Sequence, residues 1–244
     1  ILKNNWYGIK LDGSGNNVFI MNNITENKYN FGVCGGMLSH FIQEIDTSNT
    51  VNGRPIYYLL NQQNLIIDSY MSPNIGYLGI INSTNIIVRN LTLHTNNLQG
   101  LLFAYTNDSI MENLEVSYNQ IGIQVSTSIN NTVRKSTIQN NNLGIILWID
   151  STNNAIYENT IANGGEGIEL NLYSNNNLIW HNNLVNNTVH VGIYESYNNV
   201  WDDGYPSGGN YWSNYTGVDL FSGPNQDKND NDGVGDTPYV IDAN

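Results

Sequence analysis

The sequence predicts an all-β protein, a parallel β-helix of about eight coils closed by an irregular C-terminal cap. The main observation is a repeat of about 22 residues, in which a glycine is followed by alternating apolar residues and an Asn-rich corner. A fixed period of this length is typical of one structural unit stacked on itself. The copies begin at Gly8, Gly32, Gly79, Gly100, Gly122, Gly144, Gly167 and Gly192.

The pattern inside one period predicts strands. Apolar residues alternate in twos, as in Ile123 and Val125, and the segments are short and bounded by Asn, Ser and Gly. No stretch has the spacing of an amphipathic helix. Each period should therefore be one coil of two or three strands, stacked at the usual inter-strand spacing of about 4.8 Å. We expect the β-helix to cover residues 1–200.

A second strand and a corner complete each coil. The second strand aligns on inward apolar residues at Phe19, Val88, Met111, Val133, Ile156 and Ile179. Five residues later comes another inward set, at Ile24, Leu93, Val116, Ile138, Ile161 and Leu184. Asn suits the corners between them because it tolerates left-handed backbone angles and can bond to its copies in adjacent coils.

Two features depart from the regular repeat. Residues 52–73 lack the pattern, and we expect an irregular insertion there. The position two after each repeat glycine should face solvent, yet it is apolar in several coils. This column contains Lys10, Cys34, Ile81, Leu102, Gln124, Ile146 and Glu169. Either residues 52–73 fold over the column, or it contacts another subunit or domain.

Charge is distributed unevenly along the chain. The net charge is −13, and after Lys135 there are thirteen acidic residues and one base, Lys228. This balance argues against nucleic acid as a partner and favours cations. In the earlier coils, opposite charges should alternate in two outward columns. These are Arg89, Glu112 and Arg134, and then Lys135, Glu158 and His181.

Residues 201–244 break the repeat and are rich in Gly, Pro, Tyr, Trp and Asp. The end of a solenoid exposes strand edges and an open core, so we expect this segment to be a cap. Its aromatic residues should cover the last coil. They are Trp201, Tyr205, Tyr211, Trp212 and Tyr215.

A calcium site is predicted within the cap. Alternating Asp and Asn side chains followed by glycine can converge their oxygens on a hard cation. The candidate ligands are Asp227, Asn229, Asp230, Asp232 and Asp236, with Asp202, Asp203 and Asp219 as possible additions. The match to a calcium loop is imperfect because no Glu follows at the twelfth position, so a solvated acidic turn remains the alternative. Copper or zinc is not expected, because the single Cys34 and the four histidines are scattered.

Linear motifs in the cap give a resemblance to a family. The run from Trp201 to Asp242 contains GYPSGGNYW, GPNQD and DGVGDTPY, and Ile45 to Tyr58 reads IDTSNTVNGRPIYY. With the repeats, these segments resemble archaeal surface proteins built of NosD-like parallel β-helix repeats. The resemblance implies a right-handed β-helix of the carbohydrate-binding and sugar-hydrolase superfamily, exported and on the cell surface. It does not imply copper, and Asn214 stands where the family usually has Asp.

Export is also consistent with seven Asn-x-Ser/Thr sequons, which permit N-glycosylation of an exported chain. They lie at Asn23, Asn82, Asn90, Asn107, Asn130, Asn186 and Asn214. The sequence contains no apolar run long enough for a transmembrane helix. No cap is visible before Trp6, so we expect the N-terminus to be the cut end of a longer or processed chain.

No catalytic residues are predicted. Asp202 and Asp203 are the only adjacent carboxylates, and they lack the Gly-His-Gly and Arg-x-Lys companions of pectin-cleaving β-helices. We therefore expect an exported cell-surface module that is calcium-stabilised and that self-associates in a surface layer or filament, contacts other envelope proteins, or binds glycans. The alternative is a polysaccharide lyase, hydrolase or epimerase acting on a lateral groove.

Overall fold

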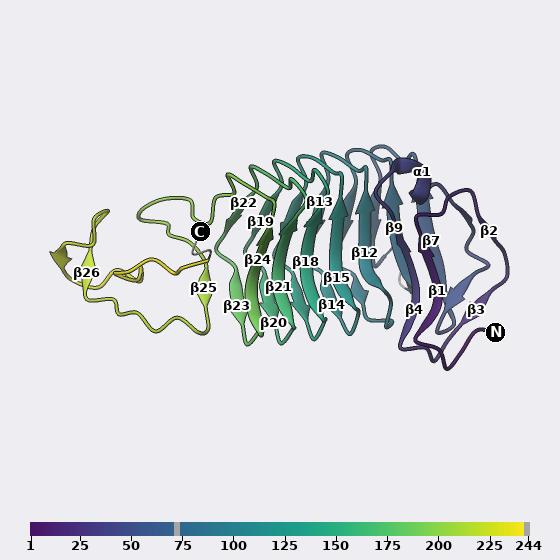
Figure 1. Ribbon diagram of the computed structural model, residues 1–244, viewed down its shortest axis with the longest axis horizontal. Helices are drawn as coiled ribbons and strands as arrows, with labels where there is room; N and C mark the ends of the chain where they lie inside the picture. Colours follow the sequence, from purple (N-terminus) through teal and green to yellow (C-terminus); the bar gives the residue numbers. More distant parts are fainter. Residues whose placement is uncertain (71–73, 242–244) are drawn as a thin grey trace.

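The computed structural model describes residues 1–70 and 74–241, and its coils stack into a parallel β-helix of about eight turns. The predicted fold class is confirmed. The coils follow one another along the long axis, with the N-terminus at one end and the C-terminal segment at the other (Figure 1). The last residues of the predicted cap, among them Asp242, and the last residues of the range 52–73 lie outside the described residues.

A nine-stranded sheet runs the length of the molecule. In spatial order it contains β24 (Val189–Tyr194), β21 (Glu166–Asn171), β18 (Leu143–Trp148), β15 (Ile121–Ser126), β12 (Gln99–Ala104), β9 (Tyr77–Ile81), β7 (Arg54–Leu60), β6 (Thr50–Val51) and β3 (Asn23–Ile24). Ile123, Ile145 and Ile168 pair across successive strands and are fully buried. This sheet therefore supplies one continuous wall of the lumen.

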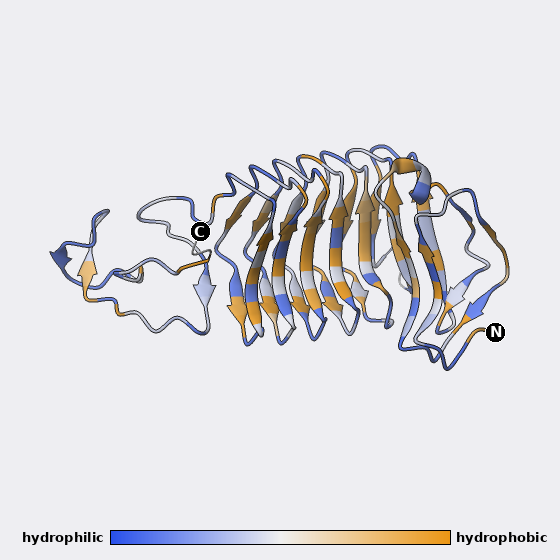
Figure 2. Cartoon of the chain, in the orientation of Figure 1, coloured by the Kyte–Doolittle hydropathy of each residue, from blue (hydrophilic) through white to orange (hydrophobic). Residues whose placement is uncertain are grey.

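Two six-stranded parallel sheets complete the coils. One contains β22 (Leu178–Trp180), β19 (Ala155–Tyr157), β16 (Thr132–Arg134), β13 (Ile110–Glu112), β10 (Ile87–Arg89) and β8 (Ile66–Asp68). The other contains β11 (Thr92–Leu93), β14 (Glu115–Ser117), β17 (Thr137–Gln139), β20 (Thr160–Ala162), β23 (Asn183–Val185) and β25 (Tyr211–Trp212). The inward residues predicted from Val88 and Leu93 onward all lie in one buried core. Hydrophobic residues follow the strands, and hydrophilic residues concentrate in the turns (Figure 2).

The repeat glycine has a steric cause in four coils. A Cβ at Gly122 would lie 2.5 Å from the carbonyl oxygen of Gly144 in the next coil and 2.7 Å from Cγ2 of Ile138. The equivalent positions are Gly100, Gly122, Gly144 and Gly167. The predicted copies at Gly79 and Gly192 are wrong in register. Gly79 pairs with Leu102 and Gly192 pairs with Glu169, and each of these partners lies two positions after the repeat glycine of its own strand. In β24 the equivalent residue is His190, whose side chain packs near the Trp212 ring instead of a further coil.

The corners carry a repeated hydrogen-bond device. A residue with positive φ, such as Asn130, Asn153 or Asn176, precedes a buried Asn whose side chain bonds to the neighbouring coil. The Asn154 carboxamide accepts from the backbone N–H of Asn131 at 2.8 Å and donates to the carbonyl oxygen of Ser128 at 3.0 Å. Asn177 bonds Asn154 in the same way, so the corner forms a ladder through successive coils. The predicted role of Asn at the corners is confirmed.

Three further ladders follow the same rule, two of asparagines at the other corners and one of serines at the corner that holds Asn131 and Asn154. One uses Asn119 and Asn141, and another uses Asn159, Asn182 and Asn210. The last uses serines, with hydroxyl oxygens that accept from the backbone of the preceding coil. Its members are Ser128, Ser151, Ser174 and Ser196. These side chains satisfy buried backbone N–H groups that the strands leave unpaired at the corners.

The predicted charge columns form outside the lumen. Arg134 pairs with Glu112 at 2.6 Å, and Arg89 pairs with Asp68 at 3.4 Å. Lys135 lies 3.7 Å from Glu158. His181, expected to end the second column, makes its ion pair with Asp203 of the C-terminal segment instead, at 3.4 Å.

Residues 1–51 form a separate layer, which we call the N-terminal layer. It makes two coils of its own, whose strands pair in parallel. The pairs are β1 (Tyr7–Asp12) with β4 (Tyr29–Cys34), β2 (Val18–Phe19) with β5 (Glu44–Ile45), and β3 with β6. The layer also includes the short helix α1 (Leu38–Phe41). Its core residues Phe31 and Phe41 pack in one cluster with Ile81 and Leu102, on the outer side of β9 and β12.

Two expectations are corrected by this arrangement. The N-terminal layer, together with Tyr58 of β7, covers the apolar outward column, so Ile81 and Leu102 have no exposed surface. The described part of the range 52–73 is not an irregular insertion, because it contains β7 and β8. The regular repeat, with its glycine, is interrupted there. Asn52 and Gly53, both with positive φ, form a tight turn, so that β6 and β7 pair antiparallel.

No helix among the described residues is long and apolar enough to cross a membrane.

Replacing Asn154 with alanine should lower the free energy of unfolding by roughly 2–4 kcal/mol, because it leaves a buried N–H and a buried C=O without partners. Chemical denaturation of the variant measures this loss. Asn142→Ala is the matched control, since Asn142 is exposed and its replacement should cost within about 0.5 kcal/mol. Equal stability of the two variants would contradict a structural role for the Asn ladder.

Candidate functional site

The C-terminal segment attaches to the last coil at two places. β25 adds to the third sheet beside β23, and Val200 forms a bridge with Leu178 of β22. Trp212 is 9% exposed and belongs to the lumen core, with its ring stacked on Tyr239 at 4.2 Å. Trp201 and Tyr215 also pack against this core, whereas Tyr205 and Tyr211 are largely exposed. The contributions of Tyr239 and Ile241 were missed by the sequence reasoning.

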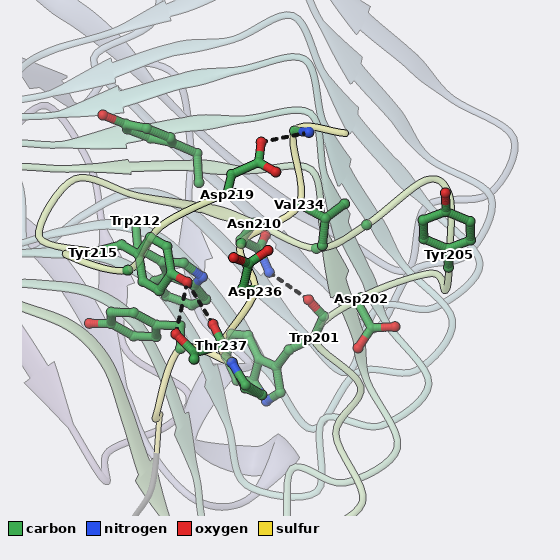
Figure 3. Close-up of a pocket in the computed structure, with 18 of the residues that line it drawn as sticks. Trp201, Asp202, Tyr205, Asn210, Trp212, Tyr215, Asp219, Val234, Asp236 and Thr237 are labelled. Carbon is green, nitrogen blue, oxygen red and sulfur yellow. Dashed lines mark hydrogen bonds between the residues drawn. The ribbon is translucent and has the colours of Figure 1, made fainter. Parts of the chain in front are cut away.

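Between the last coil and this segment lies a half-open cavity of about 1090 Å³ (Figure 3). Its aromatic wall contains Trp201, Tyr205, Tyr211, Trp212, Tyr215 and Tyr239. Polar groups line the same space, among them Asp202, Asn210 and Asp236. We take this cavity as the candidate functional site because it combines aromatic faces with hydrogen-bonding groups.

Hydrogen bonds hold the cavity wall in place. The Tyr215 hydroxyl donates to the carbonyl oxygen of Thr237 at 2.7 Å, and the Asn210 amide donates to the carbonyl oxygen of Trp201 at 2.9 Å (Figure 3). A Cβ at Gly217 or Gly235 would overlap the Tyr215 ring. Gly217 and Gly235 therefore leave room for the Tyr215 ring between the two stretches of the segment on which they lie.

His181, Ser207 and Asp203 meet at the rim of the cavity. The Ser207 hydroxyl lies 3.0 Å from Nε2 of His181 and donates to Asp203 at 2.8 Å. In a nucleophilic triad the carboxylate orients the histidine through its other ring nitrogen. Here Asp203 contacts the same nitrogen that faces the serine, at 3.4 Å, so the three side chains clamp the loop to the coil and do not form a relay.

The predicted calcium ligands divide into two groups. Asp219, Asp232 and Asp236 accept hydrogen bonds from backbone N–H groups and join the branches of the cap. Asp227, Asn229 and Asp230 are exposed, near the hairpin of β26 (Phe221–Ser222) and β27 (Lys228–Asn229). Asp202 accepts from the N–H of Gly204, and Asp203 belongs to the rim clamp. Within residues 1–70 and 74–241, no group of three or more His, Cys, Asp or Glu side chains is placed to hold a metal.

Hydrogen bonding shifts one of these carboxyls. Desolvation raises the pKa of Asp232, but bonds from the backbone of Val234 and Gly223 and from the Gln226 side chain outweigh it, so the pKa lies below its ordinary value. Asp232 therefore acts in the structure as a charged acceptor for the cap backbone.

The seven sequons lie on the surface of the coils and the cap. Six of the asparagines are exposed, and Asn107 is half-buried, with its side chain accepting from the N–H of Ile129 at 2.7 Å. The glycosylation of these residues stays a prediction.

A pair of glutamates outside the cavity was also missed. Glu166 and Glu169 lie on β21, and the pKa of Glu166 is raised to about 7 by burial and by the charge of Glu169. The repeat pattern does not predict this pair, because it places Glu169 in an outward column, where a charged residue is expected to face solvent.

The comparisons with known proteins identify the family. The family model described as "Periplasmic copper-binding protein (NosD)" matches residues 39–217, and the chain belongs to this family. The resemblance to NosD-like β-helix proteins is confirmed to that extent. No curated protein and no solved structure matches the chain.

The donor set of the described residues does not fit copper. Copper sites use clustered Cys, Met or His ligands. Burial raises the pKa of the Cys34 thiol to about 11, which disfavours the thiolate form that binds metal. His190 is buried beside Trp212, and desolvation lowers its pKa, yet no second His or Cys in residues 1–70 and 74–241 joins it in a ligand group. We therefore derive no step through copper.

Proposed function

We propose that this protein is an exported glycan-binding module that takes a neutral saccharide chain into the cavity at the end of the β-helix. Membership in a family described as periplasmic supports export. The observation that carries the proposal is the concentration of six aromatic rings on one polar-rimmed cavity. A carbohydrate presents apolar C–H faces and a ring of hydroxyls, and such a wall matches both.

The polar groups of the cavity fit saccharide hydroxyls. Asp202 and Asp236 are acceptors, and the exposed rings of Tyr205 and Tyr211 offer stacking surfaces near the opening. Among the described residues, no Lys or Arg lines the cavity, and its carboxylates would repel an acidic polysaccharide. The proposal is therefore restricted to neutral glycans.

Isothermal titration with cellotetraose, maltotetraose and mannotetraose tests the proposal. At least one should bind and change the fluorescence of Trp201 or Trp212. Tyr205→Ala should weaken that binding roughly two- to tenfold, because an aromatic contact contributes roughly 0.5–1.5 kcal/mol. Tyr197→Ala is the matched control, since Tyr197 is 61% exposed and does not line the cavity. Failure of all three oligosaccharides to bind would overturn the proposal.

Calcium binding by the cap is a second proposal. Five carboxylates, Asp219, Asp227, Asp230, Asp232 and Asp236, fall within a short stretch of chain. Some of their oxygens keep a free lone pair, such as Oδ1 of Asp236, which accepts one backbone N–H. A cation bound there would stabilise the folded state by mass action.

Thermal unfolding in calcium chloride and in a chelator tests this second proposal. Calcium at about one hundred times its dissociation constant should stabilise the fold by about 2.7 kcal/mol. Asp236→Asn should abolish the calcium effect, and Asp150→Asn, on an exposed corner of the solenoid, should retain it. An identical midpoint with calcium and with chelator would rule calcium out.

A further inference from the structure

The outer face of β18, β21 and β24 carries an acidic and aromatic surface that lies outside the cavity. Strand pairing aligns Ile146, Glu169 and Gly192 in one outward column. A second outward column contains Trp148, Asn171 and Tyr194. The N-terminal layer covers the earlier coils of this face, but Tyr194 is 51% exposed.

Glu166 occupies an unusual place on this face. A Cβ at Gly192 would overlap Oε1 of Glu166 and approach the Tyr194 ring to 2.9 Å, so only glycine leaves room for the carboxyl between the β24 backbone and that ring. Oε1 has no accessible surface and no hydrogen-bond partner among the described residues. A buried carboxyl oxygen without a partner is costly, and more so when ionised.

The surroundings of Glu166 disfavour its charge. Its pKa is raised to about 7, first by burial and then by Glu169 on the same strand. Tyr194 is the titratable group facing it from β24, and the charge of Glu166 raises the pKa of Tyr194 in turn. From β18 the neighbours are Leu143 and Ile146, which do not titrate. None of the ion pairs found among the described residues includes Glu166 or Glu169.

We propose that this surface binds a primary ammonium group, held by Glu166 and Glu169 and stacked on the Tyr194 ring. A cation supplies the hydrogen-bond donor that Oε1 lacks and offsets the repulsion between the two carboxylates. The face of an aromatic ring attracts a cation, so the Tyr194 ring adds a second favourable contact for the ammonium. Tyr194 is exposed enough for its ring to move aside as the ligand enters.

The pH dependence of binding follows from the carboxyl. The ammonium binds the ionised form of Glu166, so its affinity should rise as the pH increases through about 7 and fall in acid. Binding near pH 7 should release about half a proton per ligand, because about half of the Glu166 population is then protonated. Both effects belong to this site and are independent of the cavity.

The experiment compares two sources of the ammonium group. A 2-aminoethyl glucoside and an end-blocked Ala-Lys-Ala peptide, whose primary amines both stay protonated in this range, are titrated calorimetrically between pH 5.5 and 7.5, in buffers of different ionisation enthalpy. The N-acetylated form of the glucoside, which lacks the ammonium, is the ligand control. At least one amine ligand should bind with proton release, and which of them binds identifies a sugar or a peptide as the source.

Two variants, each of which removes one negative charge, test whether Glu166 binds the ammonium group. Glu166→Gln should weaken amine binding about tenfold and remove proton release, since the amide imitates the protonated acid. Glu195→Gln, on an exposed corner of the next coil, should leave both unchanged. Absence of binding by both amines, or equal binding by wild type and Glu166→Gln, would overturn the proposal.

Discussion

The structure depends on satisfying the backbone at the corners of the coils. Each corner turns a buried chain sharply, which leaves N–H and C=O groups that the three sheets do not pair. Buried Asn and Ser side chains supply the missing partners from the next coil, as Asn154 does for Asn131. Since each side chain serves its neighbour, a coil is complete only when another coil or the cap follows it.

This dependence determines where a ligand can act. The lumen is filled by apolar side chains, and the corners are committed to hydrogen bonds between coils. Side chains that are free to bind a ligand remain at the end of the stack and on the outer face that the N-terminal layer leaves uncovered. The cavity beside Trp212 and the surface around Glu166 occupy these two places. They differ in kind, since aromatic rings dominate the first and paired carboxylates the second.

The sequence predicts the coils well because the strand period and the corner residues are local. It fails where distant segments meet. The N-terminal layer covers Leu102, and no pattern near Leu102 indicates which segment will do so. The raised pKa of Glu166 likewise depends on burial, and its carboxyl lies against Gly192 of the next coil, a glycine that the repeat pattern places in the wrong register. Self-association is tested by nothing in the structure and stays a prediction.

Native-state hydrogen exchange tests the central claim most directly. If the side-chain ladders hold the coils together, the backbone amides of Asn131, Asn154 and Asn177 should exchange as slowly as strand amides such as that of Ile145, because both open only when coils separate. Exchange of these corner amides at the rate of exposed loops, with the strands still protected, would contradict the account.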